Sequence, residues 1–186
     1  EAGLDLTPVA GVTLGITGFY NRLDGAIANV TIGPNLRQRR NVDAIVAKGI
    51  ELTARAARGR FSVDGSYAFS DSRVHASGAS RQLDGFIPAQ SPRHSGSATL
   101  AWASPRGFAA SLTARYVGKQ YEDDLQTDVL PSATTLDGVL TLPVARRVAV
   151  VLRGENLSDE TVITRNAAGS IDVGTPRTLW IGVRLR

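Results

Sequence analysis

The chain ends in the stretch Gly174-Thr175-Pro176-Arg177-Thr178-Leu179-Trp180-Ile181-Gly182-Val183-Arg184-Leu185-Arg186, which decides the fold. Its residues alternate strictly between two faces. The apolar face carries Leu179, Ile181, Val183 and Leu185, and the other face carries Thr178, Gly182, Arg184 and Arg186. A strand of this kind requires an apolar environment on one side and an aqueous one on the other, which is typical of a transmembrane β-barrel.

The same period of two recurs along the chain and predicts about eight strands in total. They precede the terminal strand at 9–23, 43–57, 60–71, 93–103, 107–121, 133–143 and 147–157. No helical stripe competes with them. The shared parity predicts a lipid-facing surface of Val12, Leu14, Ile50, Leu52, Val63, Leu100, Leu112, Leu140, Val150 and Ile181.

The connections between the expected strands alternate in length. The short ones are Ala57-Arg58-Gly59, Ser104-Pro105-Arg106-Gly107 and Pro143-Val144-Ala145-Arg146, which suit tight hairpins. The long ones, at 24–42, 72–92, 122–132 and 158–174, have roughly ten to twenty residues each. Short turns at one rim and long loops at the other are typical of outer-membrane barrels.

Aromatic residues mark both ends of the expected apolar face. Phe61, Trp102 and Phe108 lie beside the short turns, and Tyr20, Phe69 and Tyr116 lie toward the long loops. Such rows are expected where a barrel wall meets the two membrane interfaces. The pattern therefore favours an all-β, antiparallel transmembrane barrel.

Composition narrows the function classes. The 186 residues include no cysteine and no methionine, so there is no thiolate metal site, and residue 1 is not a translation start. The net charge of +4 is spread singly, which argues against nucleic-acid binding. No apolar run reaches the length of a membrane-spanning helix. No nucleophile motif or phosphate-binding loop is present, so we expect neither an enzyme nor a cofactor.

Several motifs resemble one family. In the block Gly154-Glu155-Asn156-Leu157-Ser158-Asp159-Glu160 an Asn-Leu pair ends the penultimate strand, and Gly174-Thr175-Pro176-Arg177 leads into the last one. These features resemble the C-terminal signature of TonB-dependent outer-membrane receptors. Further matches are Gly18 to Ile27, Asn41 to Leu52, Pro92-Arg93-His94 and Arg115 to Tyr121, so the resemblance covers nearly the whole chain.

The resemblance implies a fold and a function. The family closes a barrel of about 22 strands around an N-terminal plug, and residues 1–186 correspond to its C-terminal part without the plug. It implies TonB-energised uptake of a scarce substrate, most commonly a ferric siderophore, in the outer membrane of a Gram-negative bacterium. The implied partners are outer-membrane lipid, the plug and remaining strands, TonB, and a small-molecule or metal-chelate substrate.

Two departures from the family pattern stand out. Ser158 occupies a place where the family commonly has Phe, and no Tyr follows Glu160. The sequence also ends in Arg186, where outer-membrane strands commonly end in an aromatic residue. We expect that aromatic at the next position of the natural chain. The alternative from another class is a complete eight-stranded barrel with a structural or adhesive role.

Candidate ligand contacts lie in the long loops. Arg37, Arg39 and Arg40 could meet an anion. Tyr121, Glu122, Asp123 and Asp124 could meet a cation or a ferric complex. The competing interpretation is a solvated loop in each case. His75 and His94 are the only histidines and have no carboxylate at metal-ligand spacing, so no metal site is expected.

Charges on the polar faces point to a wet interior. Arg55, Asp64, Arg115, Asp137, Arg153 and Glu155 share this parity. A charge facing lipid at mid-depth costs about 2–4 kcal/mol, so these residues are expected to face a lumen or a plug. Counting from loop centres near Gln126 and at Ala145 places Asp137 opposite Arg115 and Arg153, respectively, which predicts a lumen-wall charge ladder of these three residues.

Overall fold

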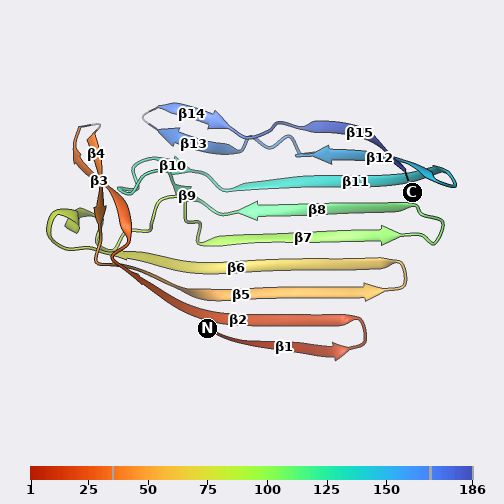
Figure 1. Cartoon of the computed structure of the whole chain (residues 1–186), viewed down its shortest axis with the longest axis horizontal. Coiled ribbons are helices and arrows are strands. Elements are labelled where there is room, and N and C mark those ends of the chain that lie inside the picture. The colour runs from red at the N-terminus through yellow and green to blue at the C-terminus, as the bar shows by residue number, and fades with distance from the viewer. Residues whose placement is uncertain (35, 168, 186) are drawn as a thin grey trace.

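The computed structural model describes residues 1–34, 36–167 and 169–185 and contains one large antiparallel sheet. Its spatial order follows the chain, so every long strand pairs with the next long strand (Figure 1). The strands are β1 (Ala2–Val9), β2 (Val12–Asp24), β5 (Ala44–Arg58), β6 (Phe61–His75), β7 (His94–Ala103), β8 (Ala109–Val117), β11 (Ala133–Ala145), β12 (Val148–Glu155) and β15 (Thr178–Leu185).

The sheet has nine strands rather than the eight predicted. The expected strand at 9–23 begins only at Val12, because the chain reverses at Ala10 and Gly11 and pairs with the preceding β1. Gly11 has a φ of 82°, and a Cβ there would lie 2.5 Å from the carbonyl oxygen of Ala57. Glycine therefore permits this turn, where a side chain would be strained and would clash.

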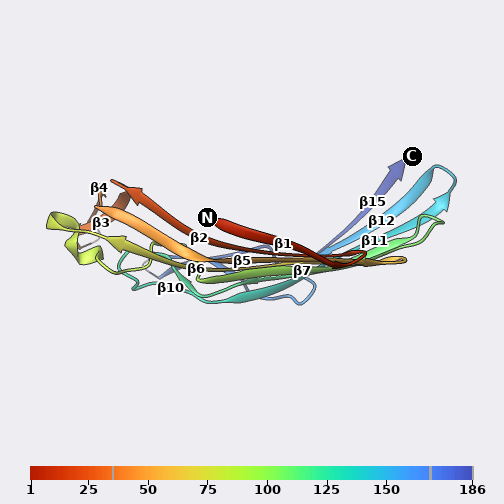
Figure 2. The ribbon, with the colours of Figure 1, turned by 90° about the horizontal axis from the view of Figure 1, so that it is seen from below.

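The sheet is open in the described residues. Strands β1 and β15 lie at opposite edges and do not pair with each other. Seen edge-on, the sheet is a curved and twisted layer (Figure 2). It is therefore not the complete eight-stranded barrel that was the alternative, since such a barrel closes on itself and has an even number of strands.

The two rims differ as predicted. All four short turns lie at one end of the sheet, and the long connections lie at the other (Figure 1). The long connections carry structure that periodicity did not predict. They contain the pairs β3 (Ile27–Gly33) with β4 (Leu36–Asn41), β9 (Gln120–Tyr121) with β10 (Val129–Leu130), and β13 (Ile163–Ala167) with β14 (Ser170–Val173), and the 3-10 helix η1 (Gly78–Leu83).

The register keeps one chemistry on each face. Leu14 lies opposite Ala54, Val63 opposite Leu100, and Leu100 opposite Leu112. The apolar face is exposed across the sheet, as at Leu14 (41%), Leu100 (51%) and Ile181 (77%). Arg186, predicted for the polar face, lies outside the described residues. No helix among the described residues is long and apolar enough to cross a membrane.

Candidate functional site

The polar face carries a row of side chains that crosses six strands at one height. We call it the polar belt, and it consists of Thr13, Arg55, Asp64, Thr99, Thr113 and Asp137, each opposite the next. The register places them together because each strand contributes one residue of the same parity. The belt is therefore built by non-local pairing of residues that are up to 124 positions apart (13 to 137).

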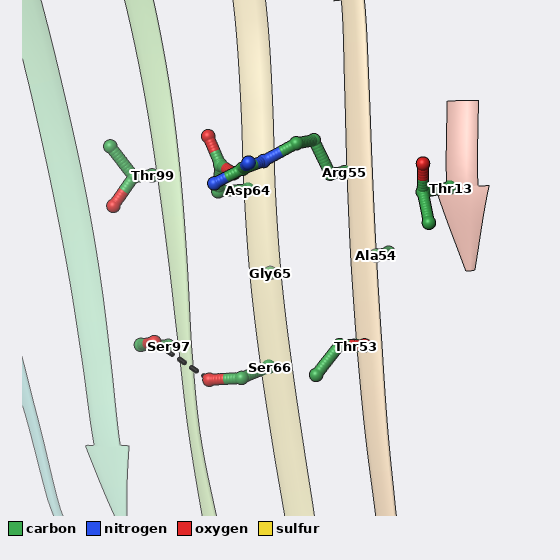
Figure 3. Close-up of a pocket in the computed structure, with 9 residues that line it drawn as sticks. All are labelled: Thr13, Thr53, Ala54, Arg55, Asp64, Gly65, Ser66, Ser97 and Thr99. Carbon is green, nitrogen blue, oxygen red and sulfur yellow. Dashed lines mark hydrogen bonds and ion pairs between the residues drawn. The ribbon is translucent and has the colours of Figure 1, made fainter. Parts of the chain in front are cut away.

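Hydrogen bonds and ion pairs link neighbours along the belt. The Nε of Arg55 lies 2.5 Å from Oδ1 of Asp64, and the hydroxyls of Thr99 and Thr113 are 2.8 Å apart. One step away, the hydroxyls of Ser66 and Ser97 are 2.9 Å apart. Figure 3 shows Arg55 reaching across β6 toward Asp64, with the Ser66 to Ser97 bond below it. Opposed polar pairs of this kind each contribute about 0.2–1 kcal/mol.

Part of the belt borders a shallow depression of about 410 Å³. Its lining is rich in hydroxyl groups, and one ion pair lies at its edge (Figure 3). The lining residues are Thr13, Thr53, Ala54, Arg55, Asp64, Gly65, Ser66, Ser97 and Thr99. Such a surface offers hydrogen-bond donors and acceptors to a hydrophilic partner.

The three residues of the predicted ladder share a face but are not stacked as expected. Arg115 forms an ion pair with Asp137, whereas Arg153 pairs with Glu155 on its own strand, Nη2 to Oε1 at 2.5 Å. The predicted register is wrong by two residues on both sides, because Arg115 lies opposite Thr135 and Arg153 opposite Val139. A two-residue shift leaves every side chain on the same face of the sheet, so the face of these three residues was predicted correctly although their register was not.

Loops from three connections pack into one cluster at the long-loop rim. Its buried core is Ala26, Val30, Val42, Val74, Ala76 and Leu83, with Leu125 packed against it. Val30 is on β3, Leu83 is in η1, and Leu125 comes from the connection between β8 and β11. Gln82 also donates from Nε2 to the carbonyl oxygen of Thr31. The long loops therefore form a joint packed unit.

Asp123 uses its oxygens inside its own loop. It is buried and accepts hydrogen bonds from the backbone N–H groups of Leu125, Thr127 and Asp128 and from the Thr127 hydroxyl. Burial alone would raise the pKa of Asp123, but these hydrogen bonds hold it below its ordinary value. This geometry gives Asp123 a structural role in shaping the turn.

Asp124 joins two neighbouring loops. Its Oδ2 accepts a hydrogen bond from the backbone N–H of Asn29 at 2.8 Å, and Ala89 also donates a backbone hydrogen bond. Burial raises the pKa of Asp124, and these two hydrogen bonds and the nearby Arg37 offset that effect only partly. Asp124 lies in the connection between β8 and β11, and it therefore links that connection to β3 and to the connection between β6 and β7.

The other candidate contacts do not converge on one point. Arg37, Arg39 and Arg40 lie on β4, where neighbours point to opposite faces, and Arg40 donates to Gln38. Tyr121 is in β9 beneath the Lys119 ammonium, and Glu122 accepts a 3.3 Å hydrogen bond from Gln90. His75 lies at the end of β6. His94 is hydrogen-bonded through Nδ1 to the Tyr67 hydroxyl at 2.7 Å.

The two C-terminal sequence blocks meet in space. Asn156 has a φ of 48° and donates from Nδ2 to the carbonyl oxygens of Glu160 and Thr175, while its Oδ1 accepts from the Glu160 N–H. Asp159 accepts a hydrogen bond from the Arg177 backbone N–H at 3.0 Å. The Asn156 N–H in turn donates to Asp137, which ties this junction to the polar belt.

Sequence reasoning missed the residues that build the loop cluster. Val30, Leu83 and Gln82 lie in segments too short for a periodic signal. The β3–β4 hairpin could have been recognised from Val30 and Ile32 alternating with Asn29 and Thr31 before Gly33 and Pro34. The contact between η1 and β3 is non-local, so the sequence of neither segment predicts it.

The comparisons with known proteins agree on one fold. Residues 1–157 match the family model described as TonB dependent receptor-like, beta-barrel. No curated protein sequence matches the chain.

Solved structures of similar fold include receptors and a transporter. The siderophore receptor PiuA from Acinetobacter baumannii superposes with a TM-score of 0.79 at 18% identity, covering 98% of this chain and 27% of that one. The ferric yersiniabactin uptake receptor FyuA from Yersinia pestis gives 0.81 at 22%, covering 98% and 28%. The copper transporter OprC gives 0.76 at 17%, covering 98% and 30%. At these identities the likeness shows the fold alone, and the chain spans less than a third of each protein.

Proposed function

This chain belongs to the family of TonB dependent receptor-like β-barrels, and we propose that it forms the C-terminal part of the barrel wall of an outer-membrane receptor that imports a scarce substrate with energy from TonB. The observation that carries the proposal is the division of one sheet into a face whose middle is apolar and a face bearing the polar belt. A wall of this kind separates lipid from a wet interior.

The polar belt supports an interior that holds a folded hydrophilic partner. Its ion pairs and hydroxyl ladders satisfy one another within the wall, so the wall stays rigid while still offering hydrogen bonds. We propose the N-terminal plug of the same receptor as that partner, because the plug would fill the lumen of a barrel of about 22 strands.

The packed loop cluster supports ligand capture at the opposite side of the membrane from TonB. Arg37 and Arg39 are exposed on β4, and burial at Val30 and Leu83 fixes the hairpin that presents them. We propose that these arginines contact an anionic metal chelate, since guanidinium groups bind carboxylate and other oxyanions well. A ferric siderophore is the proposed substrate class.

Growth under iron limitation tests the proposal. A strain without its own siderophore receptors would carry the full-length gene and would be supplied with single ferric siderophores of different charge. We expect at least one anionic ferric siderophore to support growth, and deletion of TonB to abolish it. An Arg37→Gln/Arg39→Gln variant should raise the siderophore concentration needed for half-maximal growth about tenfold or more, compared with Arg58→Gln/Arg60→Gln at the short-turn rim.

Growth that is independent of TonB, or equal uptake in the receptor-deficient parent, would contradict the uptake function. Equal growth of the β4 double variant and the short-turn control would contradict only the placing of the ligand at β4.

A further inference from the structure

The apolar face stops abruptly at the long-loop rim, and charged residues begin there. From Val63 to Phe69 on β6, and at the positions paired with them on β5 and β7, the outward face carries no Asp, Glu, Lys or Arg, and Arg58 opposite Phe61 marks its short-turn end. From Phe61 to Phe69 the β6 strand rises about 26 Å, which a barrel's strand tilt reduces to about 20 Å of membrane depth. The next outward positions therefore lie at the level of lipid headgroups.

Those next positions hold Lys48, Asp71 and Arg73. Together with Arg93, whose side chain reaches Asp71 from the residue just before β7, they form what we call the rim cluster. Lys48 lies opposite Asp71 across β5 and β6. Arg73 and Arg93 each place Nη2 3.1 Å from Oδ1 of Asp71. Two arginines thus pair with one carboxylate and Lys48 lies on the neighbouring strand, so the cluster carries a net charge of +2 on a surface that adjoins the apolar band.

Aromatic residues of the outward face lie beside two of these cations, Arg93 and Lys48. The Arg93 guanidinium lies 5.6 Å from the centre of the Phe69 ring, and Phe69 in turn packs against His94 at 5.2 Å between ring centres. Tyr20 lies opposite Lys48 on the neighbouring strand. These contacts fix Arg93 at the boundary between the aromatic row and the loops, as expected for a residue that meets a membrane interface.

The rim cluster exposes positive charge in the described part of the chain. The Nε of Arg93 is buried and has no hydrogen-bond acceptor there, so it does not belong to the exposed part of this side chain. Lys48 is exposed and makes no ion pair in the part of the chain that the structure describes. The side chains of Arg73 and Arg93 are 39% and 43% exposed, whereas the side chain of their shared partner Asp71 is only 19% exposed. The positive groups therefore face outward and the negative one lies beneath them.

We propose that the rim cluster binds the phosphate of an anionic lipid headgroup in the leaflet beside the long loops. This inference rests on the proposed membrane barrel, because only that placement brings lipid to this face. Charge complementarity, the depth of the cluster and the exposure of its cations favour a lipid phosphate over a protein partner. The lipid tails would lie along the apolar face below Phe69 and Tyr20, and the phosphate would meet Lys48, Arg73 and Arg93.

Lipid retention by the full-length receptor tests this inference. The receptor would be placed in nanodiscs with equal amounts of phosphatidic acid and phosphatidylcholine, and co-purifying lipid would be counted by native mass spectrometry. We expect the wild type to retain phosphatidic acid in preference to phosphatidylcholine. Lys48→Gln/Arg93→Gln should weaken that preference by about fivefold per cation removed. The charge-conserving Lys48→Arg/Arg93→Lys should keep most of it.

The matched control removes two arginines from the loops instead. Arg37→Gln/Arg39→Gln changes the net charge equally but lies on β4, away from the lipid-facing strands, and should leave the preference unchanged. Inorganic phosphate at the same concentration as the lipid phosphate should not displace the lipid, and displacement would overturn the assignment to a lipid.

The outcomes separate this inference from the receptor proposal. A barrel that inserts into nanodiscs but shows no preference, or one whose preference survives Lys48→Gln/Arg93→Gln, overturns the lipid site and leaves the receptor proposal standing. Failure of the wild type to insert at all overturns both.

Discussion

At the scale of single residues, Asn156 explains why two separate sequence blocks occur together. Its left-handed backbone turns the chain out of β12, and its amide joins Glu160 to Thr175 across the two blocks. Asparagine suits this position because it tolerates a positive φ and carries both a donor and an acceptor. The motif therefore fixes the junction from which the last strand starts.

Substitutions at Asn156 should separate the contribution of its left-handed backbone from that of its side-chain hydrogen bonds. Asn156→Gly keeps the backbone conformation but loses four side-chain hydrogen bonds, so we expect a loss of about 1–3 kcal/mol. Asn156→Asp should cost more, because a carboxylate would face the carbonyl oxygens of Glu160 and Thr175. Thermal unfolding of the full-length barrel in detergent measures both effects.

Asn166→Asp is the matched control, since Asn166 makes one exposed hydrogen bond to the Val129 carbonyl. It should change stability by less than either Asn156 variant. Wild-type stability of Asn156→Asp would contradict the proposed role of the amide.

Two neighbouring carboxylates are predicted to respond to pH in opposite directions. The lowered pKa of Asp123 means that its stabilisation is present above the ordinary value of 3.8 and is lost as pH falls through the lowered pKa. The raised pKa of Asp124 means that its stabilisation is present below 3.8 and is lost as pH rises through the raised pKa. At neutral pH the charge on Asp124 therefore carries a desolvation cost.

Hydrogen exchange of the loop cluster at neutral pH tests this pair. Asp123→Asn should speed exchange in residues 118–132, because the amide replaces an acceptor that serves four donors. Asp124→Asn should leave exchange unchanged or slow it, since an amide oxygen can still accept from Asn29 without the cost of a buried charge. Faster exchange in Asp124→Asn than in Asp123→Asn would show that the assignment is reversed.

At the scale of elements, the sequence predicted which face each side chain occupies, but not the register between neighbouring strands. Alternation predicted which side chains share a face, because parity within a strand is a local property. It could not predict the register of β8 with β11, since that depends on how the long connection between them is folded. The β11–β12 turn is centred on Arg146 and Arg147 and carries an irregularity near Pro143, so counting from Ala145 was two residues wrong. The hairpins and η1 in the loops were missed because non-local contacts of Val30 and Leu83 stabilise them.

Engineered disulfides can measure the register of β8 and β11 directly, because the chain has no cysteine of its own. Thr113 lies opposite Asp137, where Cα atoms are about 4.5–5.5 Å apart, within reach of a disulfide. Thr113→Cys/Asp137→Cys should therefore cross-link readily in the oxidised barrel. Arg115→Cys/Asp137→Cys are diagonal neighbours at about 7–8 Å and should cross-link poorly. The reverse order would support the register predicted from the sequence.

At the scale of the whole molecule, the sheet exposes both an apolar face and two strand edges. The apolar residues of β15 are largely exposed, including Leu179 at 73% and Leu185 at 78%. Unpaired edges of β1 and β15 offer free backbone groups to other chains. The 186-residue chain expressed alone without detergent should therefore aggregate. A monomer in plain buffer that unfolds cooperatively would count against a membrane wall.

The central claim is that one face of this sheet meets lipid and the other meets water, and paired spin labels test it most directly. Labels at Val63, Leu100 and Leu112 should collide mainly with lipid-soluble oxygen in the membrane-inserted barrel. Labels one residue along at Asp64, Thr99 and Thr113 should be shielded from the oxygen-rich lipid and, where the lumen is open, relaxed by a water-soluble nickel chelate. Preferential relaxation of the first set by the chelate, or equal accessibility of the two sets, would contradict the account.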